Sequence, residues 1–190
     1  MRKFDWIATF MVCLIVAGTL VLSLEGYALS EKKALNNLYP GSDGIKMFEQ
    51  QFNNKKIIIR QGYNGTYAVL FDIKWGFLFR VSGSASFSMS LNKMIERTWS
   101  LSSNSNKRYD AIFAVKVTDP SINKVIVTNE NIDDVILNDL SAIKSKSNVF
   151  IELPLKNGYG AAYKEMDPSI SGGFVYRGID DKGTIKFVTR

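Results

Sequence analysis

The stretch from residue 55 to residue 75, KKIIIRQGYNGTYAVLFDIKW, predicts the most definite local structure in the chain. Two runs rich in β-branched and aromatic residues, which favour strands, flank the dipeptide Asn64-Gly65. Asn-Gly favours a tight type I′ turn, because both of its residues accept positive φ angles. We therefore expect a β-hairpin with strands over 55–63 and 66–75.

A period of two continues after this hairpin. Serines occupy every second position from 82 to 90 and alternate mainly with apolar or small residues such as Val81, Ala85 and Phe87. This pattern predicts a strand over 77–91 with all of its serines on one face. That face is either the solvated side of a half-buried strand or a hydrogen-bonding surface. Shorter patterns predict further strands at 111–118, 124–128 and 148–155, and a closing hairpin of 174–179 with 184–189. Residues 94–101 fit a strand, with a short helix as the alternative.

Helical periodicity is found in two other segments. Residues 30–52 are predicted to be helical with a break at Tyr39-Pro40-Gly41. Residues 131–144 form a second predicted helix, with acidic residues at its start and lysines at its end, as the helix dipole favours. Ile136 and Leu140 lie on its apolar stripe, so we expect both to be buried. Together these elements predict an α+β domain with a mostly antiparallel sheet and one or two packed helices.

An apolar segment precedes this domain. Residues 7–24, IATFMVCLIVAGTLVLSL, contain no charge over 18 positions, and Arg2 and Lys3 precede them. A helix of that length spans about 27 Å, which is close to the hydrocarbon thickness of a bilayer. We expect a transmembrane helix with Trp6 at the interface and with Ile7, Leu14 and Leu24 in the apolar stretch. The positive-inside rule then places the N-terminus in the cytoplasm and the rest outside, at the cell membrane.

These segments predict a chain in three parts. We expect an N-terminal membrane anchor over 1–28, a helical stalk over 29–54 and one extracytoplasmic domain over 55–190. Gly26 and Ala28 are small residues near a possible cleavage point, so the alternative is a signal peptide and a secreted binding domain.

Two absences restrict the chemistry that the chain can perform. The sequence has no histidine, and its one cysteine, Cys13, lies inside the apolar segment. Histidine-based triads and the commonest zinc ligand are therefore excluded, and the domain has no disulfide. We expect no cofactor and no metal. An exported domain of this size without disulfides is more typical of a bacterial envelope than of eukaryotic secretion.

The net charge of +6 is concentrated in the first half of the domain. Residues 29–110 contain 12 Lys or Arg against 6 Asp or Glu, whereas residues 111–190 contain 10 of each. Lys55, Lys56 and Arg60 are candidates for binding an anionic envelope polymer or lipid head groups. The alternative is an ordinary basic surface that keeps the domain soluble. We expect no nucleic acid partner, because an exported domain would seldom meet one.

A second candidate region is the stretch 156–173, which is predicted to be a long glycine-containing loop. Tyr159 and Tyr163 within it offer contact area with a polar tip, which suits ligand binding. An ordinary long connection is the alternative.

Catalytic motifs in the sequence are short and isolated. Serine is followed three residues later by lysine at several places, and Asp133-Asp134 and Asp180-Asp181 form carboxylate pairs. Either arrangement could serve an envelope hydrolase. Helix-end charge and turn formation explain the same residues without catalysis. We therefore expect a membrane-anchored, non-catalytic binding or assembly domain that contacts another envelope protein or an anionic polymer, with an envelope hydrolase as the rival hypothesis.

Overall fold

The structure is a computed structural model that describes residues 2–40, 44–63, 65–88, 94–130, 139–170 and 173–189. Eleven strands and three helices lie in these ranges. The helices are α1 (Arg2–Leu24), α2 (Glu31–Leu38) and α3 (Leu140–Lys146). The strands are β1 (Ile45–Phe52), β2 (Lys55–Gly62), β3 (Gly65–Lys74), β4 (Leu78–Ser86), β5 (Ile95–Ser103), β6 (Tyr109–Val117), β7 (Lys124–Thr128), β8 (Phe150–Pro154), β9 (Tyr159–Met166), β10 (Val175–Ile179) and β11 (Ile185–Thr189).

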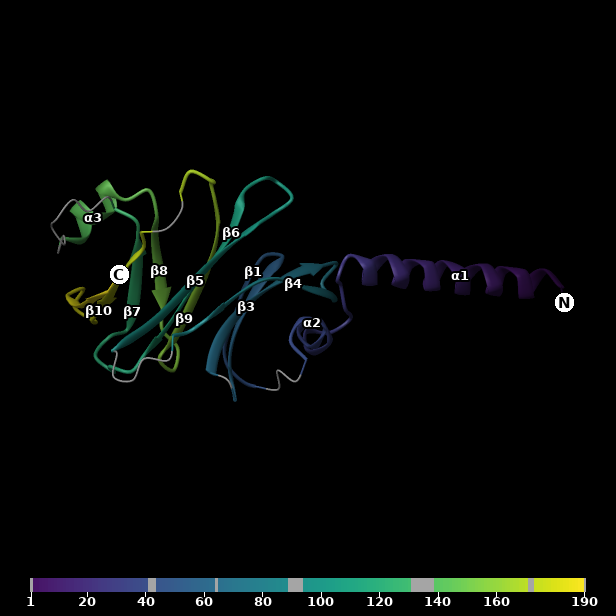
Figure 1. Ribbon diagram of the computed structural model, residues 1–190, viewed down its shortest axis with the longest axis horizontal. Coiled ribbons are helices and arrows are strands. Elements are labelled where there is room, and N and C mark those ends of the chain that lie inside the picture. The colour runs from purple at the N-terminus through teal and green to yellow at the C-terminus, as the bar shows by residue number, and fades with distance from the viewer. Residues whose placement is uncertain are drawn as a thin grey trace.

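The strands form three antiparallel sheets. The first sheet has the order β1-β2-β3-β4, the middle sheet β5-β6-β9 and the third sheet β11-β10-β7-β8. The predicted hairpin is confirmed as β2 and β3, which pair from Lys55 with Asp72 to Gly62 with Gly65. Asn64 lies outside the described residues. In Figure 1 the sheets lie at one end of the molecule, and α1 extends away from them.

Strand β6 explains how the sheets are stacked. Its alternate residues Ala111, Phe113 and Val115 pack into the apolar core shared with the third sheet. Ile112 and Ala114 point the other way, into the core shared with the first sheet. The middle sheet is therefore buried on both faces, which is why β6 is almost continuously apolar instead of alternating.

Helix α2 covers the outer face of the first sheet. The Ser30 hydroxyl oxygen accepts a hydrogen bond from the Lys33 backbone N–H at 3.2 Å and so caps the start of the helix. Ala34 and Leu35 are almost fully buried and pack against the first sheet, including Val69 and Phe71. The sheet is thus apolar on both faces.

The predicted serine face is interrupted by a β-bulge. Leu70 pairs with Gly83 but Phe71 pairs with Val81, so Ser82 is an extra residue on β4. Because of this extra residue, the odd-numbered side chains of β4 lie on one face before the bulge and on the other face after it. Ala85 continues the row of Gly83 and is buried, whereas Ser84 shares a 2.6 Å hydrogen bond with the Tyr39 hydroxyl.

The predicted α+β class with a transmembrane helix is wrong. The described chain is built mostly from antiparallel sheets. Part of the predicted helix over 30–52 is strand β1, because its backbone pairs with β2 in antiparallel register. Of the predicted helix over 131–144, residues 131–138 lie outside the described residues and Leu140 begins the seven-residue α3. There Ile143 is fully buried, while Leu140 is only half-buried.

The predicted membrane crossing also requires correction. Helix α1 begins at Arg2 and ends at Leu24, over the segment expected to span the bilayer. Within the described ranges, none of the helices combines the length and the apolar character that a bilayer crossing requires.

Candidate functional site

A polar pocket lies where four strands of the first and middle sheets end together. Lys55 on β2 and Asp72 on β3 are paired across the hairpin and continue the inward-facing rows that contain Ile57 and Leu70. Asp110 on β6 likewise precedes the inward-facing Ile112. The apolar core between the two sheets therefore ends in a cluster of charged side chains.

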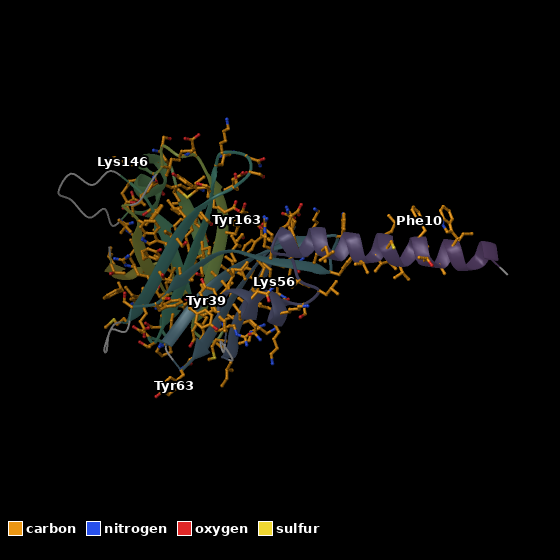
Figure 2. The ribbon with its side chains drawn as sticks, turned by 45° about the vertical axis from the view of Figure 1, so that its right-hand side comes forward. Phe10, Tyr39, Lys56, Tyr63, Lys146 and Tyr163 are labelled. Atoms are coloured by element: carbon orange, nitrogen blue, oxygen red, sulfur yellow. The ribbon has the colours of Figure 1, made fainter. Side chains whose placement is uncertain are left out.

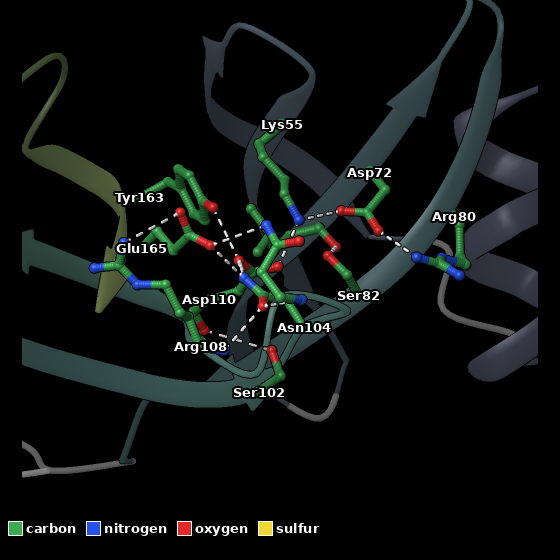
Figure 3. A network of polar contacts seen from close by, with 12 residues as sticks. Lys55, Asp72, Arg80, Ser82, Ser102, Asn104, Arg108, Asp110, Tyr163 and Glu165 are labelled. Atoms are coloured by element: carbon green, nitrogen blue, oxygen red, sulfur yellow. Dashed lines mark hydrogen bonds and ion pairs between the residues drawn. The ribbon is translucent and has the colours of Figure 1, made fainter. Parts of the chain in front are cut away.

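Lys55 is at the centre of this cluster (Figure 3). Its Nζ donates to Asp72 Oδ1 and to Asp110 Oδ2, each at 2.5 Å. Arg80 Nη2 donates to the other oxygen of Asp72 at 2.6 Å. The side chains of Lys55, Asp72 and Asp110 are only 12%, 13% and 4% exposed, so these ion pairs are well shielded from water.

A second layer of hydrogen bonds surrounds Asp110. The Tyr163 hydroxyl donates to Asp110 Oδ1 at 2.9 Å, and Asn104 Nδ2 donates to the same oxygen at 3.0 Å. The Asn104 amide also donates to Glu165 Oε1 at 2.8 Å. Arg108 lies 3.9 Å from the other Glu165 oxygen. The turn between β5 and β6 is thereby joined to β6 and β9 at one end of the middle sheet.

The pKa shifts in the pocket keep its groups in their ordinary charge states. Burial would lower the pKa of Lys55, but hydrogen bonds from its ammonium to Asp110 and Asp72 outweigh burial and raise it. Burial would raise the pKa of Asp72, but Lys55 and Arg80 hold it below its usual value. Burial and the hydrogen bond to Asp110 both raise the pKa of Tyr163. None of these shifts moves a group towards neutral pH, where a general acid or base works best.

The cavity beside this cluster has a volume of about 360 Å³. That is within the size range of small-ligand sites, about 300–1,000 Å³. Its wall includes Tyr27, Lys74 and Arg80, and Tyr27 lies three residues after the end of α1. The Arg80 guanidinium carbon is 4.9 Å from the Tyr27 ring centroid. Part of the pocket wall therefore lies close to the C-terminal end of α1.

Two of the residues predicted from the sequence meet in this pocket. Lys55 Nζ lies 5.5 Å from the ring centroid of Tyr163. Lys56 and Arg60 lie on the opposite face of β2, because successive residues of a strand alternate. Tyr159 is only 6% exposed and packs in the core between the first and middle sheets. The five predicted binding residues therefore do not form one site.

The basic residues on the α2 side of the first sheet already have partners. Lys56 Nζ lies 2.7 Å from Glu31 Oε1 and 3.3 Å from Glu49 Oε2. The Arg60 guanidinium donates to the Gly44 carbonyl at 2.5 Å. The two carboxylates compensate the charge of Lys56, whereas the neutral carbonyl satisfies a donor of Arg60 without compensating its charge.

The predicted anchor residues lie on α1. Trp6, Ile7 and Leu14 expose more than half of their surface. Leu24 is the last residue of the helix, and its side chain is outside the described set.

Sequence reasoning missed several residues of the pocket, above all Asp72, Asp110, Asn104 and Glu165. One signal was present. Asp72 and Asp110 each occupy an inward-facing position next to a strongly apolar strand segment, where a charged residue requires a partner. Which partner each carboxylate has depends on the stacking of the sheets and is not encoded locally.

The catalytic pairs considered in the sequence have structural roles where they are described. Ser30 caps α2, and the Ser141 backbone N–H donates to Asp139, the residue that caps α3. Asp180 accepts hydrogen bonds from the backbone of Lys182 and Thr184 in the β10–β11 turn. Asp133 and Asp134 lie outside the described residues. Among the residues that are described, no cluster of three or more Asp, Glu, His or Cys could hold a metal ion.

Comparison of the chain with protein-family models, curated proteins and solved structures finds no match. The function is therefore inferred from the geometry of the site and from the character of α1.

The charge network predicts a defined dependence of stability on pH. A carboxyl whose pKa is lower in the folded state stabilises the fold above its unfolded pKa and loses that contribution as pH falls through the folded pKa. For Asp72 this loss occurs below about pH 3.8, the ordinary value. Lys55 has a raised pKa, so its contribution is complete below pH 10.5 and is lost above it.

We expect the unfolding free energy contributed by this network to be constant between about pH 5 and pH 9 and to fall outside that window. Urea denaturation at a series of pH values measures it. The variant Asp72→Asn should weaken the decline at acidic pH. If the unfolding free energy of that variant fell at acidic pH as steeply as that of the unaltered protein, Asp72 would not be the cause of the decline.

Proposed function

We propose that this protein is a membrane-attached, non-catalytic binding module of a cell envelope. Helix α1 attaches it to the bilayer, and the pocket around Lys55 and Asp110 receives the ligand or a side chain of a partner. The observation that carries this proposal is the character of α1, whose described apolar side chains are uncovered on every side.

Successive residues of a helix are turned by about 100°, so the exposed positions of α1 can be placed around its axis. The large apolar side chains that are at least half exposed are Trp6, Ile7, Phe10, Met11, Val12, Leu14, Ile15, Val16 and Leu20. Their positions are distributed around the whole circumference. Figures 1 and 2 show α1, with Phe10 on it, projecting away from the sheets. The described apolar side chains of α1 thus face every direction and are not covered by the sheets, so an apolar environment would stabilise them.

The free energy available from this surface is sufficient for attachment. Moving one large apolar side chain from water to an apolar environment contributes about 1.5–3 kcal/mol. Burial of four such side chains in lipid would therefore contribute roughly 6–12 kcal/mol, before the entropy of attachment is subtracted. No contact with protein is needed to explain why α1 is apolar.

The electrostatics of the pocket support binding in preference to hydrolysis. Lys55 is held as a charged ammonium by two carboxylates, so it is a poor base for activating a serine. Asp72 has a lowered pKa and is a poor general acid. A rigid set of donors and acceptors is instead suited to recognising a polar group by hydrogen bonds.

Charge placed on α1 tests the proposal. We expect the double variant Val12→Asp, Ile15→Asp to move the protein from the membrane fraction to the soluble fraction, because each charge in hydrocarbon costs about 2.5–3.5 kcal/mol. The matched control is Ile45→Asp, Tyr63→Asp, which adds the same charge at exposed positions of the β domain. The control should remain with membranes through a high-salt wash and be released only by detergent. Attachment through α1 would be rejected if the α1 variant stayed in the membrane fraction, or if both variants were lost from that fraction to the same extent.

A further inference from the structure

The turn between β3 and β4 exposes two aromatic side chains near the C-terminal end of α1. Trp75 is 69% exposed and Phe77 is 53% exposed. Their ring centroids lie 6.3 Å apart, so the two rings form one small apolar surface, named here the aromatic turn. The Lys74 ammonium lies 5.2 Å from the Trp75 ring centroid, and more than half of each side chain remains exposed.

The backbone of the aromatic turn is also unfavourable for the residue that occupies it. Trp75 has a φ of 56° and Gly76 a φ of 81°. Glycine accepts a positive φ readily, but a bulky side chain such as tryptophan rarely does. An exposed tryptophan in a left-handed conformation is thus disfavoured by both solvation and sterics, which indicates that the ring has a role outside the fold.

Several contacts fix the aromatic turn next to the end of α1. Ala28 and Phe79 exchange two backbone hydrogen bonds of 2.8 Å, which attach the chain after α1 to the start of β4. Lys74 Nζ lies 3.6 Å from Glu25 Oε2 and 5.5 Å from the Tyr27 ring centroid. The turn and the apolar helix are therefore neighbours in space, although 50 residues separate Glu25 from Trp75 in the sequence.

We infer that the aromatic turn inserts into the head-group layer of the same bilayer that holds α1, and so forms a second membrane contact. This inference rests on the proposed membrane attachment. Tryptophan favours the head-group level because its ring is apolar and its indole N–H can still donate a hydrogen bond. Lys74 lies beside Trp75, where its ammonium can reach lipid phosphates while its stem remains in the interface.

Two membrane contacts restrict the orientation of the domain. A single helix would leave the domain free to swing about the end of α1, whereas a second contact on β3–β4 holds one edge of the first sheet at the lipid surface. Because Lys74 and Arg80 also line the pocket, the pocket is then held at that surface. Its ligand would be a polar group within reach of the head groups.

Depth-dependent fluorescence quenching tests this inference on the full chain in phospholipid vesicles. The sequence has three tryptophans. The double variant Trp6→Phe, Trp99→Phe leaves Trp75 as the only one. Tyr63 is fully exposed at the β2–β3 turn, at the opposite end of β3. The matched control is therefore Trp6→Phe, Trp75→Phe, Trp99→Phe, Tyr63→Trp.

We expect lipids brominated near the head groups to quench Trp75 several-fold more strongly than the tryptophan introduced at position 63, and the Trp75 emission to shift to shorter wavelength on incorporation. Equal quenching at both positions in a protein that still floats with the vesicles would overturn the inference and leave membrane attachment by α1 intact. A blue shift that grows with protein concentration and is insensitive to brominated lipid would assign the aromatic turn to a second copy, and would also overturn it. Failure of the full chain to float with vesicles would reject the proposed function itself and, with it, this inference.

Discussion

Replacing Arg177 with methionine is expected to lower the unfolding free energy by about 3–5 kcal/mol, because the change leaves a buried carboxylate without its partner. The side chains of Arg177 and Glu130 are 0% and 1% exposed, and Arg177 Nη2 donates to Glu130 Oε1. Arg177 Nη1 also donates to Thr128 Oγ1 at 2.8 Å. Urea denaturation of the single variant measures the loss.

The double variant Arg177→Met, Glu130→Gln separates the lost pair from lost packing. Burial would raise the pKa of Glu130, but the hydrogen bond from Arg177 lowers it, so the carboxylate is charged and depends on the arginine. Neutral glutamine removes that charge, and we expect the double variant to recover at least half of the loss. A double variant no more stable than Arg177→Met would show that the charge of Glu130 is not the cause.

Replacing Lys55 with methionine is expected to cost about 3 kcal/mol of unfolding free energy. Methionine preserves much of the apolar stem but leaves Asp72 and Asp110 facing each other without the ammonium between them. Arg80 still binds Asp72, and Tyr163 still donates to Asp110, so we expect a loss at the lower end of the range for buried pairs. Thermal and urea denaturation both measure it.

A surface lysine provides the matched control for this prediction. Lys74 lines the same pocket but its side chain is 40% exposed. Lys74→Met should therefore change the unfolding free energy by less than about 1 kcal/mol, as exposed ion pairs contribute little. Adding Asp110→Asn to Lys55→Met should restore part of the lost stability. Equal losses in Lys55→Met and Lys74→Met would contradict the central position of Lys55 in the network.

The sequence predicted the hairpins well because their signals are local. The β2–β3 hairpin has strand-forming runs on both sides of Asn-Gly, and the β10–β11 pair has the same arrangement around a glycine-containing turn. Both depend on residues that are neighbours along the chain. Their prediction required no knowledge of which sheet covers which.

Strand β1 was predicted to be helical because its apolar residues do not have a period of two. The register with β2 shifts between Lys46 and Phe48, where one extra residue enters β1. Met47, Phe48 and Phe52 consequently contact the same core at a spacing that resembles one face of a helix. A bulge is specified by pairing with the neighbouring strand, so this sequence pattern alone could not reveal it.

Strand β9 was predicted to be a loop because its first residue, Tyr159, is followed by three small residues of low strand propensity, Gly160, Ala161 and Ala162. The structure explains why a glycine occupies position 160. A Cβ at this position would lie 3.0 Å from the Pro154 carbonyl oxygen and 3.1 Å from Leu155 Cδ2. The close approach of β8 therefore favours glycine over strand-forming residues. As a result, Tyr163 was identified as a binding candidate for its chemistry, and its contact with Asp110 became visible only in the folded structure.

Labelling of Cys13 tests most directly whether a bilayer covers α1. Cys13 is the only cysteine in the sequence, lies in the middle of α1 and is exposed in the structure. The control is a cysteine at the exposed β2–β3 turn, in the variant Cys13→Ser, Tyr63→Cys. With the full chain in vesicles, we expect a water-soluble maleimide to label the control rapidly and to label Cys13 only after denaturing detergent dissolves the bilayer. Labelling of Cys13 in intact vesicles as fast as the control would contradict membrane attachment through α1.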